Sequence, residues 1–296
     1  MDEHPLPATL AGRRGRRMAL ASPDRVTPAR REAPAGAPRV RRPHASWLLT
    51  LATVAVIFAA WYAIARFRVV SELFVPHPAA VWEAFTETLL DGYRGGTLLR
   101  HLVDSLYRVL AGFLLALVTA VPLGLAIGYS RWVRAVFDPL IEFYRPLPPL
   151  AYYTLLVIWL GIENESKIAL LYLAAFPPLS ISAMAGVGGI AQERVQAAQS
   201  LGAGRWQVFR HVVFPSCLPD IFTGMRVSIG FTYTTLVAAE MVAATSGVGW
   251  MVLDASKFLR SDVIFMGIIV MGLTGIALDR IVRVVEWRAV PWKGKA

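Results

Sequence analysis

Long runs of apolar residues alternate with short polar segments along most of this chain. A helix needs about 20 mostly apolar residues to cross a bilayer, and six runs fit or approach that length, at roughly 47–65, 102–127, 147–160, 168–187, 222–244 and 263–285. The third run is short, and Pro177 and Pro178 interrupt the fourth. Prolines are tolerated in spanning helices whose neighbours satisfy the freed carbonyls. The pattern therefore predicts an all-α membrane domain of six packed transmembrane helices over residues 46–296.

The first 45 residues break this pattern. They are rich in proline, alanine and arginine, with ten arginines against four acids, and show no apolar periodicity. We expect a disordered basic arm in the cytoplasm that can touch anionic headgroups. Ala63-Ile64-Ala65 looks like a signal-peptide cleavage site. The charged leader is far too long for a signal peptide, so we interpret 47–65 as an uncleaved span.

Composition and charge agree with a membrane protein. Of the 296 residues 56% are hydrophobic and only 17% are charged, whereas soluble domains carry about 25% charged residues. The net charge of +10 is uneven, since residues 1–45 hold six of the ten excess charges. With the amino terminus inside, the cytoplasmic segments carry 22 Lys and Arg residues and the opposite side carries 7. The positive-inside rule then places both termini, and the segment 190–219, in the cytoplasm.

The segment 190–219 is a polar block between two apolar runs. Residues 196–201 are good helix formers, and Gly202 can adopt the left-handed conformation that ends a helix. Residues 205–213 can form a second helix, and we expect Pro215 to stop it. Two small alanines on a short helix allow a partner protein to approach closely. The block predicts a docking surface made of Gln196, Ala197, Ala198, Gly202, Val212, Phe214 and Pro215.

This block resembles the signature loop of permease subunits of binding-protein-dependent ABC importers. That loop is usually written E-A-A-x3-G-x9-I-x-L-P, and the spacing here matches it throughout, with Val212 for Ile and Phe214 for Leu. Gln196 departs from the usual Glu, which removes a salt bridge from that position to an ATPase. Two helices around a glycine turn are also the form of a DNA-binding helix-turn-helix. The apolar flanks, and only two arginines between Gln196 and Pro215, disfavour that alternative.

Further segments are similar to the permeases for taurine, aliphatic sulfonates and nitrate, and nearest to those for taurine. They are Pro76-His77-Pro78, His101 to Gly112, Asp138 to Ala151, Leu236 to Met241 and Gly247 to Met251. The resemblance covers roughly residues 70–293. It implies a subunit of a bacterial inner-membrane importer that pairs with a second copy of itself and forms the path for taurine or another sulfonate, nitrate or another small nutrient.

The same resemblance implies the other parts of the importer. Two cytoplasmic ATPase subunits would dock on the signature loops, and a periplasmic binding protein would deliver the substrate. ATP and Mg would be bound by the ATPases, with no cofactor in this chain. Within the sequence there is no phosphate-binding G-x-x-x-x-G-K-[ST] loop and no Cys/His metal spacing. We therefore expect a non-catalytic subunit. The single Cys217 excludes a disulfide within the chain.

A few polar residues inside the apolar runs are candidates for the translocation path. Glu240 lies deep in the fifth run, where an unpaired carboxylate is costly. It could contact substrate, or it could be structural, paired with hydroxyls or an arginine. Asp104 and Arg108 are four residues apart and are expected to pair. Path hydroxyls are offered by Thr232, Tyr233, Thr234 and Thr235, although such hydroxyls also bond back to their own helix.

The remaining alternative is a transporter driven by an ion gradient. An ion-coupled secondary transporter usually shows internal repeats and several intramembrane carboxylates. This sequence has no clear repeat and essentially one deep carboxylate. An importer permease is the better interpretation.

Overall fold

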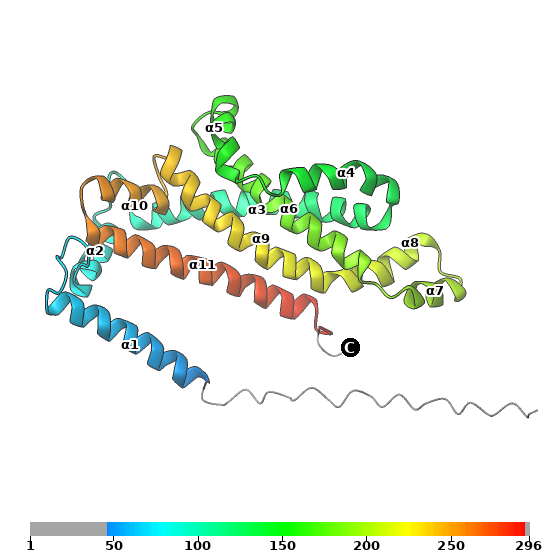
Figure 1. Ribbon diagram of the computed structural model, residues 1–296, viewed down its shortest axis with the longest axis horizontal. Helices are drawn as coiled ribbons and strands as arrows, with labels where there is room; N and C mark the ends of the chain where they lie inside the picture. Colours follow the sequence, from blue (N-terminus) through cyan, green and yellow to red (C-terminus); the bar gives the residue numbers. More distant parts are fainter. Residues whose placement is uncertain (1–45, 294–296) are drawn as a thin grey trace, which may run out of the picture. The chain divides into compact units, whose positions relative to one another are not determined.

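The computed structural model describes residues 46–293, and these form helices joined by short connections (Figure 1). The predicted basic arm, residues 1–45, lies outside the described residues. Apart from an isolated bridge between Tyr93 and Gly96, the described part of the chain contains no extended pairing. The all-α prediction is confirmed. The helices are α1 Ser46–Arg66, α2 Pro78–Leu90, α3 Leu98–Tyr129, α4 Arg131–Tyr144, α5 Pro149–Leu160, α6 Asn164–Gly188, α7 Gln192–Ser200, α8 Arg205–Val208, the π-helical turn η1 Phe209–Val213, α9 Phe214–Ala243, α10 Val248–Lys257 and α11 Ser261–Ala289.

The chain divides into two compact units, residues 1–52 and 53–296. The described part of the first unit is the beginning of α1, which is solvent-exposed and strongly apolar. The second unit contains everything from the middle of α1 onward, including all the sites discussed below.

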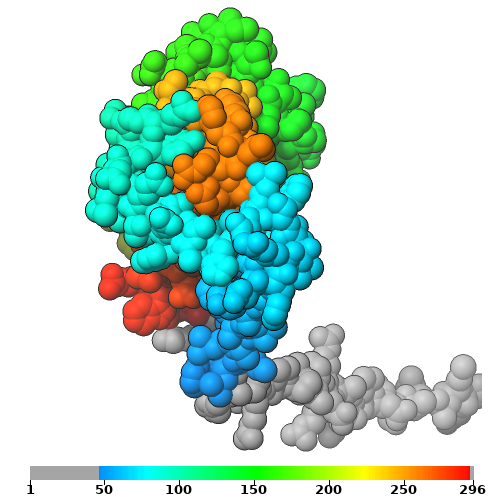
Figure 2. All heavy atoms as spheres, turned by 90° about the vertical axis from the view of Figure 1, so that its left-hand side faces the viewer, coloured from blue at the N-terminus to red at the C-terminus, as the bar shows by residue number. Residues whose placement is uncertain are grey.

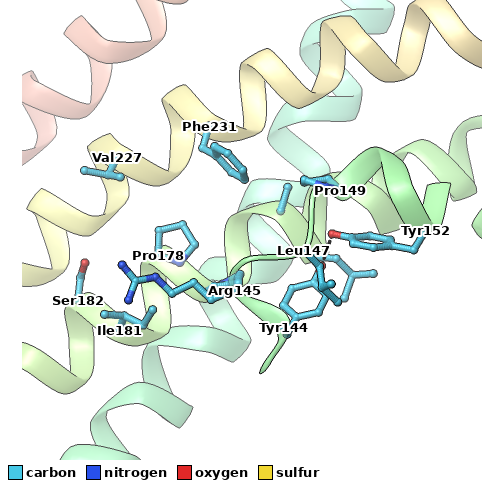
Figure 3. A pocket seen from close by; sticks show the side chains of 13 residues that line it. Tyr144, Arg145, Leu147, Pro149, Tyr152, Pro178, Ile181, Ser182, Val227 and Phe231 are labelled. Carbon is cyan, nitrogen blue, oxygen red and sulfur yellow. Dashed lines mark hydrogen bonds between the residues drawn. The ribbon is translucent and has the colours of Figure 1, made fainter. Parts of the chain in front are cut away.

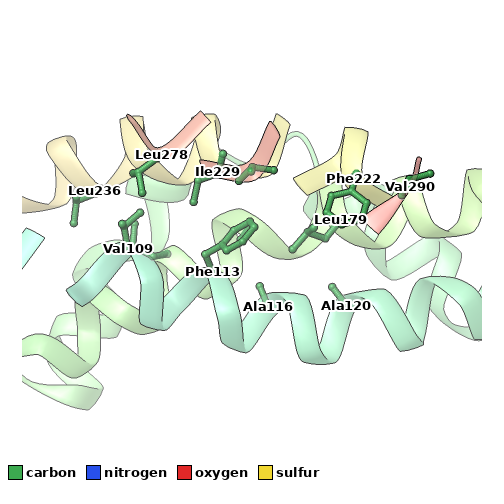
Figure 4. Packing of buried hydrophobic residues seen from close by; sticks show 13 residues of the cluster. Val109, Phe113, Ala116, Ala120, Leu179, Phe222, Ile229, Leu236, Leu278 and Val290 are labelled. Carbon is green, nitrogen blue, oxygen red and sulfur yellow. The ribbon is translucent and has the colours of Figure 1, made fainter. Parts of the chain in front are cut away.

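The core of the second unit forms where α3, α6, α9 and α11 run side by side (Figures 1 and 4). Its buried side chains include Val109, Phe113, Leu179 and Leu236. Small residues bring the helices close, as is usual between helices in a membrane. At Gly112 of α3, a Cβ atom would lie 2.7 Å from the Cβ of Leu171 in α6. Only glycine permits this approach.

A second apolar cluster joins α2, α10 and α11 at one end of this unit. It includes Val81, Ala84, Met251 and Met266. Figure 2 shows the orange surface of α10 next to the cyan surface of the residues that precede and begin α3. At this end Tyr93 donates a hydrogen bond to Asp254 at 3.1 Å, which ties the connection before α3 to α10.

The six predicted runs lie within helices to within two residues at their ends, since α5 begins at Pro149 and α9 ends at Ala243. The lengths of these helices differ from a uniform set of six spans. Within residues 46–293, four helices are long and apolar enough to cross a membrane: α1, α3, α6 and α11. A fifth candidate is the segment Arg205–Ala243, which bends by 46° into α10. Helix α5 is apolar but has only 12 residues, so the count of six spans stays a prediction. Helix α6 continues through Pro177 and Pro178, as expected.

Three helices were not anticipated: α2, α4 and α10. Each is shorter than a bilayer span and carries mixed polar and apolar residues. Pro78 begins α2 at a position where a missing N–H costs nothing, and His77 caps it by accepting from the Ala79 amide at 3.2 Å.

Candidate functional site

The polar block folds as the sequence predicts in its first half. Helix α7 ends at Ser200, and Gly202 follows with φ of +83°. The amides of Gly202 and Ala203 bond back to the carbonyls of Gln199 and Ala198 at 2.9 and 3.1 Å. This left-handed closure satisfies carbonyls at the end of α7 and favours glycine. Gly204 then begins α8, with its amide bonded to the Gln207 side chain at 2.8 Å.

The second half of the block corrects one expectation. Pro215 does not stop the helix, because α8 runs through the π-helical turn η1 directly into α9. The amide of Phe214 bonds to the carbonyl of Phe209, five residues back. A π turn is wider than an α turn and relieves the crowding that a proline ring causes in the preceding turn. Pro215 then sits at the beginning of α9, where its missing N–H is tolerated. Helix α8, the turn η1 and the long helix α9 therefore form one continuous helical path, and the break at Gly202 separates α7 from it.

The outer side of the block is exposed, and its inner side packs against α3 and α6. Val208, Val213 and Cys217 are buried in a cluster with Leu125 and Ala183 of α3 and α6. On the outer side, a shallow groove of about 400 Å³ lies between α7 and α8. Of the seven residues predicted to form the docking surface, Ala198, Gly202 and Val212 line this groove. Gln196, Ala197, Phe214 and Pro215 do not line it, although Gln196, Ala197 and Phe214 are exposed.

Two further residues of this surface were missed from the sequence. Leu201 is 89% exposed at the end of α7, and Trp206 is 68% exposed and stacked on Phe209 with ring centroids 5.6 Å apart. Large apolar side chains within a polar segment were the signal that would have found them.

A second site surrounds the carboxylate of Glu240 in α9. This side chain is only 1% exposed and accepts hydrogen bonds from three groups. Arg108 of α3 donates to it at 2.7 Å, the Ser105 hydroxyl at 2.8 Å, and the Gly249 amide at 2.9 Å. Glu240 is therefore paired and fully hydrogen-bonded, as a buried carboxylate must be to be tolerated.

Arg108 does not pair with Asp104, contrary to the sequence-based expectation. Besides Glu240, its guanidinium donates to Asn164 at 2.7 Å and to the Ser246 carbonyl and hydroxyl at 2.8 and 2.9 Å. The buried pair with Glu240 forms in place of the i,i+4 pair with Asp104 because water screens a buried ion pair less. Among the described residues, no ion pair joins Asp104.

The connection between α9 and α10 closes over this ion pair. Gly247 has φ of +115°, and its amide bonds to His101 at 3.2 Å. A Cβ atom at Gly247 would collide with the carboxylate of Glu240. The Val248 amide bonds to the Ser105 hydroxyl at 3.0 Å. The cluster thus fastens α3, the beginning of α6, α9 and α10 together.

The hydroxyls of α9 are mostly satisfied within the chain. Thr232 donates to the Ser228 carbonyl at 2.7 Å, and Thr234 and Thr235 both donate to the Phe231 carbonyl at 2.9 Å. These bonds to the same helix are the alternative to a role in the translocation path. Tyr233 donates instead to the Met271 carbonyl of α11 at 3.0 Å. Across residues 46–293, no group of three His, Cys, Asp or Glu residues is placed to hold a metal ion.

A cavity of about 350 Å³ lies between the connection from α4 to α5 and the faces of α6 and α9 (Figure 3). Its lining is largely apolar and aromatic, with Tyr152 and Phe231 on opposite sides. The one charged residue in the lining is Arg145, at the end of α4. The cavity was not anticipated, because its walls come from segments far apart in the sequence.

Comparison with known proteins gives independent evidence on the family of this chain. Residues 120–290 match the family model described as binding-protein-dependent transport system inner membrane component. The chain is 44% identical over 248 residues to the taurine transport system permease protein TauC of Escherichia coli, covering 83% of this chain and 90% of that protein. It is 34% identical over 247 residues to the putative aliphatic sulfonates transport permease protein SsuC of Bacillus subtilis, covering 83% and 88%.

Two more relatives widen the comparison. The nitrate import permease protein NrtB of Synechocystis is 31% identical over 226 residues, which cover 75% of this chain and 82% of that protein. Among solved structures, a chain of the inward-facing MetNI methionine ABC transporter is similar, with a TM-score of 0.53 and 20% identity over 64% of this chain and 95% of that one. At 20% identity, this structural similarity shows the fold alone.

Proposed function

Because this chain belongs to the family of binding-protein-dependent transport system inner membrane components, we propose that it forms the translocation path of an ATP-driven importer for taurine or another small sulfonate. Membership makes the chain a membrane subunit of an ABC importer. The substrate, the partners and the orientation are the parts that we add.

The substrate assignment draws on the relatives. Those that match most of this chain carry the names of taurine, aliphatic sulfonate and nitrate permeases, and the taurine permease TauC is the most similar of those cited, at 44% identity. A small sulfonate is therefore the first choice. Nitrate or another small nutrient is the second, because the nitrate permease is 31% identical over 226 residues.

The assembly follows from the family and from the exposed surfaces. Two copies of this chain would enclose the path, two ATPase subunits would bind ATP and Mg, and a periplasmic binding protein would deliver the substrate. This chain would supply no catalysis. The long helices carry many exposed apolar side chains, among them Val227 and Phe231 of α9, which lipid or a second subunit must cover.

The observation that carries the coupling mechanism is the unbroken helical path from the docking groove into α9. An ATPase seated on Ala198, Gly202, Leu201 and Trp206 would pull on α7 and α8. Because η1 and α9 continue α8 without a break, that displacement passes along α9. Closure of the two ATPases on ATP would thus draw the two loops together and turn the bundle from inward- to outward-facing.

Glu240 is assigned a structural role in this scheme. Its charge is balanced by Arg108, and each oxygen accepts a hydrogen bond. The neutral pair would not repel a passing sulfonate, and it would hold the far end of α9 to α3 while the near end moves. The positive-inside count supports cytoplasmic termini and a docking loop on the ATPase side of the inner membrane.

Two measurements test this function together. Native mass spectrometry of the complex purified through a tag on this chain should give two copies of it with two ATPase subunits. Uptake of labelled taurine by cells lacking their own sulfonate importers, and expressing the whole importer, should be competed by unlabelled taurine and sulfonates but not by nitrate. Competition by nitrate alone would move the assignment to the second choice. A chain that purifies with no ATPase would contradict the importer model.

A further inference from the structure

The cavity in Figure 3 combines one free cation with an otherwise neutral lining. Among the described residues, no carboxylate lies within ion-pair distance of the Arg145 guanidinium, although six other arginines form ion pairs. Its side chain extends past Pro178 toward Ile181 and Ser182 of α6 (Figure 3). A guanidinium offers planar, paired N–H donors that suit the oxygens of an oxyanion. Its place in the cavity therefore favours an anionic ligand.

The turn that carries Arg145 is stiff. Arg145 ends α4 and precedes Pro146, and Pro148 and Pro149 begin α5. Each proline fixes its own φ and restricts the residue before it. The Tyr144 and Tyr152 hydroxyls, one from each side of this turn, are hydrogen-bonded to each other. The backbone that carries Arg145 is thus held at the cavity by a rigid corner.

The opposite wall supplies acceptors. Pro177 and Pro178 have no N–H, so the carbonyls of Leu173 and Ala174, four residues earlier in α6, lose their usual helical donors. Leu173 and Ala174 both line the cavity. A backbone carbonyl that loses its helical donor in an apolar setting favours another donor, such as an ammonium group. The cavity therefore brings Arg145 together with two residues whose carbonyls lose their usual helical donors.

We infer that this cavity is a transit site for a small zwitterion, with its sulfonate on Arg145 and its ammonium on the carbonyls of Leu173 and Ala174. The inference rests on the proposed function and extends it to a specific site. Aromatic side chains of Tyr152 and Phe231 would contact the short methylene chain between the two charges. Residues 145–148 lie on the cytoplasmic side in the proposed topology, so this is the last site that an incoming solute would meet.

The test uses the whole importer in proteoliposomes, with ATP in the lumen and taurine-loaded binding protein in excess outside. Arg145→Gln should lower the initial rate of labelled taurine uptake about tenfold or more, because it removes the charge-assisted hydrogen bonds to the sulfonate. Arg145→Lys should restore part of the rate. Arg134→Gln removes an exposed arginine of α4 that does not line the cavity, and it should transport like the unaltered protein.

Assembly is checked by co-purification with the ATPase. If Arg145→Gln does not assemble, Ile181→Trp tests the cavity instead. This substitution narrows the cavity from α6 without changing the charge, so it should also lower taurine uptake. Uptake at the unaltered rate in an assembled Arg145→Gln or Ile181→Trp importer would overturn the site and leave the proposed function standing. An unaltered importer that does not take up taurine would overturn both.

Discussion

Arg108 and Glu240 are 132 positions apart in the sequence, and their side chains meet at 2.7 Å. Both side chains are almost completely buried, at 4% and 1% exposure. Their contact joins α3 to α9, and the hydrogen bonds to Ser246 and Gly249 extend it to the connection before α10. The pair therefore fixes the end of α9 that lies opposite the docking loop.

Removing one member of this pair should destabilise the subunit more than removing both. Glu240→Leu leaves the Arg108 guanidinium buried without its counter-charge, which costs roughly 3–5 kcal/mol in buried pairs. Glu240→Gln keeps an acceptor for Arg108 and should cost less. The double variant Arg108→Leu with Glu240→Leu should recover part of the loss. Thermal melts of the purified subunit, combined in a double-mutant cycle, measure the coupling between the two residues.

The outcome for transport separates the two roles of Glu240. With a structural role, Glu240→Gln loses uptake only in proportion to its lower stability. A Glu240→Gln variant that melts normally and assembles with the ATPase but does not transport would show that the carboxylate acts on the substrate.

Gly247→Ala should be among the most damaging single-methyl additions. Its φ of +115° disfavours any side chain, and the added Cβ would collide with the Glu240 carboxylate. Gly161→Ala is a matched control, since Gly161 has φ of +85° but no heavy atom within 4 Å of the added Cβ. The control isolates the backbone cost, which is about 1–3 kcal/mol for a side chain in this glycine-favouring region. Equal losses of melting temperature for the two variants would mean that the contact with Glu240 does not constrain this connection.

Gly202→Val should uncouple transport while leaving insertion intact. Its φ of +83° favours glycine at the end of α7, and a β-branched residue there would alter the groove. We expect normal amounts of subunit in the membrane but weaker ATPase binding in a pull-down. Gly204→Ala, in the same loop with φ of −69°, should behave like the unaltered protein. Normal binding and transport by Gly202→Val would remove the loop from the coupling mechanism.

Orientation is tested by cysteine labelling in intact cells. Cys217 is buried and should give little background. Cysteines placed at Ser22 and Gly294 should be protected from a membrane-impermeant maleimide, whereas one at the exposed Asp91 should react. Reaction of either terminus from outside would overturn the positive-inside assignment.

The sequence predicted the parts of this fold that depend on local pattern. Long apolar runs gave all the long helices, because burial in lipid requires length and apolarity together. The left-handed Gly202 was predicted because few residues other than glycine adopt that conformation. Helices α2, α4 and α10 were missed because their amphipathic or short segments carry a weak signal for a span.

The site depended on contacts that local pattern does not encode. Arg108 was assigned to Asp104 by the i,i+4 rule, yet its partner comes from a helix 132 positions away. Pro215 was expected to end a helix, but the helix continues from α8 through the π-helical turn η1 into α9, which contains Pro215. The cavity at Arg145 requires α4, α5, α6 and α9 to be in place. Each of these features is set by tertiary packing.

The central claim is that this chain is the path through which an ATPase drives taurine inward, and uptake into proteoliposomes tests it most directly. The importer is reconstituted with its docking loop facing the lumen and with taurine-loaded binding protein outside. ATP and Mg in the lumen should produce accumulation of labelled taurine above the external concentration. A non-hydrolysable ATP analogue should produce none. Equal accumulation with the analogue, or none with ATP while the assembled ATPase hydrolyses it, would contradict the account.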